Sequence, residues 1–292
     1  MNEKYAVVTG ATSGIGLQIA RGIAATGYNT IIVARDQEKA RLARQEIESV
    51  STGNTRVHIE IADLASLDSI EALATRIISQ FPQTSLLVNN AGIIVLKKKL
   101  SKDGIEMNLA VNHLAPFLLT WRLLPLLRQH PGARVVNVNS NAHEKAKLQE
   151  SDLEPTSLFD SMGAYGQSKL ASMFTTLELA RLVPPAEVTF NAVHPGMVAT
   201  NIGKVGGLME LVGILLRPFM LTPKKGADTA LWASTAPELA GVTGRYYEKR
   251  AVSQTNPLLQ DAHLAKVVWQ KTLKMARLNE FQLLPQPFQP VG

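Results

Sequence analysis

Tyr165 and Lys169 are the residues whose types and spacing first indicate chemistry. If both lie on one helix, residues four apart share a face, so the phenol and the ammonium group point the same way. A phenol has an ordinary pKa of about 10, and a positive charge within a few ångströms lowers that pKa. The pair could then exchange a proton near neutral pH. Taken alone, so short a spacing more often describes two surface side chains, and the surrounding elements must decide.

A glycine-rich turn near the N-terminus is the second chemical pattern. Residues 5–8 are a short strand-type run, followed by Gly10, Gly14 and Gly16 and then by a helical pattern from Leu17. Strand, turn and helix in this order place free backbone N–H groups at a helix N-terminus, where they bind phosphate. Such a turn can also have no ligand, but its place after the first strand favours dinucleotide binding.

Two side chains at later strand ends bear on the choice of cofactor. Arg35 follows the predicted strand 30–34, where an acid would bind a free ribose 2′-hydroxyl and an arginine would accommodate a 2′-phosphate. Arg35 therefore favours NADP(H) over NAD(H), although the adjacent Asp36 is suited to capping a helix. Asp63 follows the predicted strand 56–61, and it could meet the adenine or cap the next helix.

The elements that must position these residues alternate between strand and helix. This alternation, with mostly apolar strands, predicts an α/β fold: a single Rossmann-type doubly wound parallel sheet of about seven strands with helices on both faces. Ligands bind beyond the carboxyl ends of such strands, where all the candidate residues fall. The further predicted strands are 86–88, 133–138 and 188–194, and the predicted helices are 37–50, 66–80 and 104–128, the last broken near Pro116.

Composition excludes several classes of protein. The chain has 292 residues, of which 46% are hydrophobic and 18% charged, which is enough for a sizeable core. It has no cysteine, so disulfides, thiolate metal sites and a cysteine nucleophile are excluded, and a cytoplasmic protein is expected. The net charge of +6 is spread along the chain, and the run 97–99 is too short to indicate nucleic-acid binding. No signal peptide or transmembrane segment is predicted.

The motifs together resemble the short-chain dehydrogenase/reductase family over about residues 4 to 275. They are the glycine turn, Asn89-Asn90-Ala91-Gly92, Asn112, Ser140, Tyr165-x-x-x-Lys169 and His194-Pro195-Gly196, in family order. The retinol-dehydrogenase-like branch is most similar, through segments such as 33–36, 103–108 and 222–227. Light-dependent protochlorophyllide reductases share much of this layout but use an active-site cysteine.

The resemblance implies a role for each catalytic residue. Tyr165 would exchange the proton with the substrate, Lys169 would lower the phenol pKa and hold the nicotinamide ribose, and Ser140 would bind the carbonyl oxygen. Asn112 would kink its helix and hold a water molecule in the proton relay, and no metal is required. The implied cofactor contacts are Gly10, Thr12, Ser13, Gly14, Ile15, Gly16, Arg35, Asp63, Leu64, Asn90, Ala91, Gly92, Tyr165, Lys169, Pro195, Gly196, Val198 and Thr200.

Some features depart from the family pattern or leave alternatives open. Asn139 stands before the catalytic serine where most relatives have Ser or Gly, so it could reshape the pocket. His143 could line the pocket or lie on a surface loop, and His194 is expected to be structural. Residues 1–278 are expected to form one domain with an apolar substrate lid near 203–221, although the lid residues could instead pack on the domain or a neighbouring subunit. Residues 279–292 are expected to be an extended or disordered tail, or to pack on a neighbour or the pocket rim.

The predicted function is an NADP(H)-dependent oxidoreductase that interconverts a lipophilic aldehyde or ketone and its alcohol by hydride transfer. A double-bond reductase and a non-catalytic NADP-binding sensor are the alternatives. The intact set of four catalytic residues argues against the sensor. The sequence leaves open a peripheral contact with a membrane and assembly into a homo-oligomer.

Overall fold

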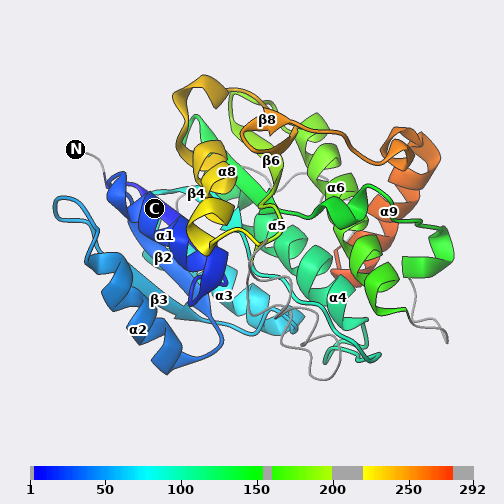
Figure 1. Cartoon of the computed structure of the whole chain (residues 1–292), viewed down its shortest axis with the longest axis horizontal. Coiled ribbons are helices and arrows are strands. Elements are labelled where there is room, and N and C mark those ends of the chain that lie inside the picture. The colour runs from blue at the N-terminus through cyan, green and yellow to red at the C-terminus, as the bar shows by residue number, and fades with distance from the viewer. Residues whose placement is uncertain (1–2, 154–159, 199–219, 279–292) are drawn as a thin grey trace, which may run out of the picture.

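The computed structural model describes residues 3–153, 160–198 and 220–278 (Figure 1). The strands are β1 (Tyr5–Thr9), β2 (Asn29–Ala34), β3 (Val57–Ile61), β4 (Thr84–Asn89), β5 (Ala133–Val138), β6 (Val188–His194), β7 (Tyr246–Glu248) and β8 (Ala251–Val252). The α-helices are α1 (Gly14–Ala25), α2 (Gln37–Glu48), α3 (Leu67–Gln80), α4 (Met107–Leu109), α5 (Ala115–Leu127), α6 (Ser161–Leu182), α8 (Pro223–Thr235) and α9 (Ala262–Met275).

The strands form one sheet in the order β3-β2-β1-β4-β5-β6-β7-β8. All neighbours pair in parallel except β7 and β8. The expected doubly wound parallel sheet is therefore confirmed, with eight strands instead of about seven. The additional strand β8 has two residues, too few to give a sequence pattern.

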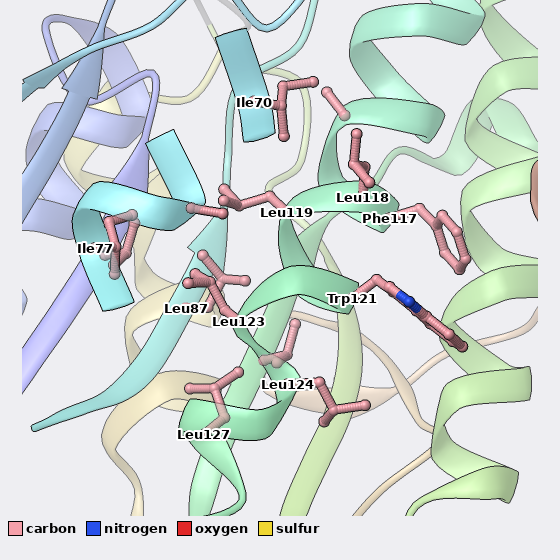
Figure 2. Packing of buried hydrophobic residues seen from close by; sticks show 14 of the residues in the cluster. Ile70, Ile77, Leu87, Phe117, Leu118, Leu119, Trp121, Leu123, Leu124 and Leu127 are labelled. Carbon is pink, nitrogen blue, oxygen red and sulfur yellow. The ribbon is translucent and has the colours of Figure 1, made fainter. Parts of the chain in front are cut away.

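Apolar layers cover both faces of the sheet. One layer joins α1, α2 and α8 to residues such as Val8 and Ile32, and the other joins α3 and α5 to residues such as Val7 and Leu87. In the second layer, Phe117 and Trp121 of α5 pack beside aliphatic side chains of the same helix (Figure 2). Strand order reverses between β1 and β4, and this switch point is where such sheets bind ligands.

The predicted long helix 104–128 is divided in the structure. It comprises the short α4, a π-helical turn at Ala110–Leu114 and then α5. The break therefore comes just before Pro116, which lies in the first turn of α5 and needs no backbone hydrogen bond there. π-turns inside helices occur often at functional sites, and Asn112 lies within this one.

A chain of buried polar side chains crosses the sheet below its carboxyl edge. Asn89 and Asn137 are register partners on β4 and β5, and Asn89 Nδ2 donates to Asn137 Oδ1 at 2.8 Å. Asn89 Nδ2 also donates to Thr120 Oγ1 of α5, and Asn137 Nδ2 donates to Thr176 Oγ1 of α6. This amide ladder joins two strands to the helices on one face.

Several predictions fall outside the described residues. They are Thr200, all but the end of the lid 203–221, and the tail 279–292. Within the described ranges, no helix is long and apolar enough to cross a membrane.

Candidate functional site

A cleft of about 600 Å³ lies at the switch point, along the carboxyl ends of the strands. It brings together residues from segments that are far apart in the sequence. Every predicted site residue within the described ranges lines it, except Asn112. The predicted residues in its wall are Gly10, Thr12, Ser13, Gly14, Ile15, Gly16, Arg35, Asp63, Leu64, Asn90, Ala91, Gly92, Ser140, Tyr165, Lys169, Pro195, Gly196 and Val198.

The glycine turn is held in place by Asn90. The Asn90 Nδ2 group donates to the carbonyl oxygens of Thr9 at 2.9 Å and Gly10 at 3.2 Å. Gly10 has φ of 66° and Gly14 has φ of 57°, a backbone conformation that strongly favours glycine. A Cβ atom on Gly16 would lie under 3.0 Å from Asn90 Nδ2 and Gly10 O, so this position accepts no side chain without rearrangement.

Arg35 and Asp63 lie at the adjacent strand ends, and both line the cleft. Arg35 has an exposed guanidinium and forms no ion pair in the part of the chain that the structure describes. Asp36 caps α2 by accepting from the Lys39 backbone N–H at 3.0 Å, so it is turned toward the helix. Asp63 does not cap α3, whose N-cap is Ser66, and its carboxylate accepts instead from the Ala65 backbone N–H.

Helix α6 carries Tyr165 and Lys169 on one face, as their spacing predicts. The Lys169 ammonium lies 5.9 Å from the centroid of the Tyr165 ring, and it donates to the Val138 carbonyl at 2.9 Å. Asp160 starts this helix by accepting from the Gly163 N–H. The cap and the buried face of α6 therefore fix where the phenol and the ammonium enter the cleft.

The electrostatics of the pair differ from the expectation. Burial raises the pKa of the Tyr165 phenol, and a side-chain hydrogen bond with Ser140 opposes this rise only in part. Lys169 is itself buried, and desolvation lowers its pKa to about 8. The expected net lowering of the phenol pKa is therefore not found among the protein's own groups, because burial of the phenol is the largest effect on it.

Ser140 is placed by the segment that follows β5. Its hydroxyl accepts from the Ala142 N–H at 3.2 Å, and its carbonyl accepts from His143 Nδ1 at 2.7 Å. Since a carbonyl can only accept, Nδ1 carries the proton. Burial lowers the pKa of His143, so the ring remains neutral at pH 7. His143 is thus a buried support of the serine turn, so both positions that the sequence left open, in the cleft lining and on a surface loop, are wrong.

Asn112 lies behind the cleft wall and does not line it. Its Oδ1 accepts from the Ile93 N–H at 2.8 Å, and its Nδ2 donates to the Ile93 carbonyl at 2.9 Å and to Ser168 Oγ at 3.1 Å. A Cβ atom on Gly92 would lie 3.3 Å from Asn112 Oδ1 and 3.6 Å from Lys169 Nζ, so these groups are neighbours. Asn112 joins the strand-end loop to α6 at the catalytic turn.

Asn139 connects the two catalytic segments directly. Its Nδ2 donates to the Lys169 carbonyl at 3.0 Å, and its Oδ1 accepts from the Ser140 N–H at 2.7 Å. The side chain lines the cleft but is buried, with 3% of its surface exposed. The departure from the family pattern is therefore a clamp between the end of β5 and α6.

We expect Asn139→Ser to lower kcat about tenfold while the KM for cofactor changes little, because the shorter side chain cannot span Ser140 and Lys169. Asn191→Ser is the matched control. Asn191 is also 3% exposed and makes two backbone bonds, to Val242 and Arg245, away from the cleft. Both variants should lose about 1–3 kcal/mol of stability. Equal loss of kcat in the two would contradict a positioning role for Asn139.

Sequence reasoning missed an apolar wall of the cleft. Ile93, Ile94, Met107 and Val111 line it, and they come from the loop after β4 and the interrupted helix. Their apolar character was visible, but nothing in a single sequence showed that these segments fold over one opening. His194, expected to be structural, also lines the cleft.

The donor set of the cleft fits a dinucleotide. The glycine turn offers a close approach to backbone at the N-terminus of α1, and Arg35 offers a guanidinium at one end. Tyr165, Lys169 and Ser140 gather hydroxyl and ammonium donors at the other end. Among the residues that the structure describes, no group of three or more His, Asp or Glu side chains could hold a metal ion.

Comparison with known proteins agrees with this arrangement. The family model described as short chain dehydrogenase matches residues 4–207. Retinol dehydrogenase 13 of Homo sapiens is 34% identical over 291 residues, covering 97% of this chain and 88% of that protein. Retinol dehydrogenase 12 of Mus musculus is 38% identical over 244 residues, covering 84% of this chain and 77% of that protein.

Solved structures show the same fold. An uncharacterized protein from Mycobacterium paratuberculosis superposes with a TM-score of 0.73 and 27% identity, covering 94% of each chain. A blue fluorescent protein from a metagenomic library, solved in complex with NADPH, superposes with a TM-score of 0.66 and 27% identity, covering 84% of this chain and 95% of that one.

Proposed function

Since the chain belongs to the short chain dehydrogenase family, we propose that it is an NADP(H)-dependent oxidoreductase acting on a lipophilic aldehyde or ketone and its alcohol. The observation that carries the proposal is the gathering of Ser140, Tyr165 and Lys169 at one end of a cleft whose other end holds the glycine turn and Arg35. A pure binding protein has no need of this acid–base set.

The roles of the residues follow from their positions. The glycine turn and Arg35 would hold the phosphates, and Lys169 would hold the ribose next to the reacting end. The bound nicotinamide would supply the hydride. Ser140 would donate a hydrogen bond to the carbonyl oxygen of the substrate as negative charge develops there. Tyr165 would give its phenolic proton to the same oxygen.

The protonation state of Tyr165 suits it to donate a proton. A reductase requires a neutral phenol that can donate, whereas alcohol oxidation requires the phenolate as the base. Because burial raises the pKa of Tyr165, the protein's own groups keep the phenol protonated at pH 7. We infer that Ile93, Ile94, Met107 and Val111 face the apolar part of the substrate.

Arg35 supports the choice of NADP(H). It lines the cleft where the adenosine ribose would lie, and its guanidinium forms no ion pair with any described residue. An unpaired guanidinium suits a 2′-phosphate, with which it can make two parallel hydrogen bonds. The NADPH bound to the metagenomic relative is consistent with this choice. A cytoplasmic location remains a prediction from the cysteine-free sequence.

The test is NADPH consumption against a panel of aldehydes, ketones and quinones, with NADH in parallel. We expect turnover with long-chain or ring-containing carbonyls and a kcat/KM with NADPH at least tenfold above that with NADH. Arg35→Asp should reverse this preference, because a carboxylate repels the 2′-phosphate and binds a free 2′-hydroxyl.

Arg44→Asp is the control for Arg35→Asp. Arg44 is a surface residue of α2 paired with Glu48, outside the cleft, so its substitution should leave the cofactor preference unchanged. NADPH binding without turnover of any carbonyl would favour the double-bond reductase or the sensor instead. A wild-type preference for NADH would contradict the role of Arg35.

A further inference from the structure

An exposed segment borders the cleft and combines apolar with basic side chains. Residues 96–100, Leu-Lys-Lys-Lys-Leu, are all exposed, with Leu96 at 38% and Leu100 at 44%. We call them the rim segment. Ile94 and Met107, on either side of it in the chain, line the cleft, so the rim segment belongs to the lip of the cleft. The Ser161 hydroxyl donates to the Val95 carbonyl at 2.7 Å and ties this lip to the start of α6.

The positive charge of the rim segment is not compensated nearby. Lys97, Lys98 and Lys99 make no ion pair within the described ranges. The two acids that follow are bonded internally. Asp103 accepts from Arg277 at 2.7 Å and from the Leu67 N–H at 2.9 Å. Glu106 caps α4 by accepting from the Leu109 N–H at 2.9 Å, and it also accepts from Asn108.

Two further apolar side chains are exposed beside the cleft. Met162 is 53% exposed in the first turn of α6, three residues before Tyr165. Met197 is 63% exposed between the cleft-lining Gly196 and Val198. The loops after β4 and β6 both leave the carboxyl edge of the parallel sheet, so Met197 and the rim segment lie at the same edge.

We propose that this edge docks on the surface of an anionic lipid bilayer, with the rim lysines on the headgroups and the flanking leucines at the acyl boundary. Apolar side chains interleaved with lysine suit this interface, since lysine stems lie along apolar surface while the ammonium groups reach phosphate. Docking would open the cleft toward the compartment in which a lipophilic carbonyl accumulates. The delivery of a lipophilic substrate rests on the proposed function, whereas the binding of this edge to a bilayer does not.

Lipid suits the rim better than nucleic acid or an acidic protein does. Nucleic-acid surfaces typically add stacking aromatic side chains to the lysines, whereas the exposed large apolar residues that the structure describes beside the cleft are aliphatic or Met. An acidic protein would neutralise the charge of the lysines. It would need an additional apolar patch to cover Leu96, Leu100 and Met162. A bilayer supplies headgroup charge and an apolar layer together.

The experiment is co-sedimentation of the full chain with phosphatidylcholine vesicles, with and without phosphatidylserine. We expect binding to the anionic vesicles, weakened by salt. Lys97→Glu/Lys98→Glu/Lys99→Glu should weaken it on the order of a hundredfold, given the attraction of each lysine to the surface. Leu96→Ser/Leu100→Ser should also weaken vesicle binding. The remaining binding should be more sensitive to salt than that of the wild type, because only the apolar contribution is removed.

The matched control is Lys4→Glu/Arg56→Glu/Arg245→Glu. These exposed side chains precede β1, β3 and β7 at the amino edge of the sheet, and both triple variants have a net charge of +6 − 6 = 0. The control should keep most of the vesicle binding. Equal loss in both triple variants, or no binding by the wild type, would overturn the proposal. Equal displacement of the wild type from vesicles by DNA and by an acidic polypeptide of matched charge would likewise overturn it, since the contact would then be charge alone.

Vesicle binding and turnover are separate measurements. The rim lysines lie outside the catalytic set, so the lysine variant should reduce a water-soluble aldehyde at the wild-type rate. Vesicle binding without turnover of any carbonyl would overturn the proposed function and leave the docking surface intact. Turnover without vesicle binding would do the reverse.

Discussion

Tyr165→Phe should lower the rate of carbonyl reduction about a thousandfold, within the range contributed by a positioned proton donor. The substitution removes only the hydroxyl, so the ring keeps its place in α6 near Lys169. NADPH binding, followed by fluorescence titration, should stay within about twofold of the wild type, because the lost group acts on the substrate oxygen. Loss of kcat with retained cofactor affinity would separate chemistry from binding.

Tyr247→Phe is the control for Tyr165→Phe. Tyr247 is a buried tyrosine of β7 whose ring packs edge-on against Trp232 and does not line the cleft. Its substitution removes the same atom and should leave turnover unchanged. If Tyr165→Phe kept more than a tenth of the wild-type rate, Tyr165 would not be the proton donor, and the other donors at this end of the cleft would need testing.

Gly16→Ala should both destabilise the protein and abolish measurable cofactor binding. A Cβ atom there would meet Asn90 Nδ2 and the Gly10 carbonyl at distances that real Cβ atoms do not show. To admit it, Asn90 must move and release its hydrogen bonds to Thr9 and Gly10. We expect a loss of about 3 kcal/mol in the free energy of unfolding, at the upper end for overpacking, measured by urea denaturation.

Gly22→Ala makes the same chemical change six residues later in α1. A Cβ atom on Gly22 would meet only side-chain atoms of Leu231, whose methyl groups can rotate away. Alanine also favours helix over glycine by about 1 kcal/mol, which offsets the crowding. Gly22→Ala should therefore remain within about 1 kcal/mol of the wild type and bind NADPH normally. If Gly16→Ala and Gly22→Ala had similar stability and similar NADPH affinity, the glycine turn would tolerate the movement of Asn90, and the expectation would be wrong.

The fold and the positions of the site residues could be predicted largely from the sequence. Apolar strands that alternate with helices along the chain predicted the parallel sheet. Residues that directly follow such strands must gather at one edge of the sheet. Gly10, Arg35 and Ser140, which follow β1, β2 and β5, therefore reach one cleft in the structure, and α6 brings Tyr165 to the same cleft.

Other features depend on contacts that sequence spacing does not reveal. The bond from Asn139 to the Lys169 carbonyl spans thirty residues, so the clamp was visible only as an unexplained departure from the family pattern. Burial decides the direction in which the pKa of Tyr165 shifts. The burial of one phenol cannot be predicted from its neighbours in the sequence. Asn112 of the π-turn likewise bonds to Ile93 and Ser168, which are 19 and 56 residues away in the chain.

The amide ladder has a consequence for how the sheet assembles. If β5 paired with β4 one residue out of register, Asn137 would point to the opposite face, toward the apolar layer of α1 and α8. Its amide would lose Asn89 and Thr176 together, and each unpaired buried group costs about 1–3 kcal/mol. A sheet with this misregistered pair is therefore less stable than the native one. Because Thr176 lies on α6, the ladder ties the register of β4 and β5 to the seating of the catalytic helix.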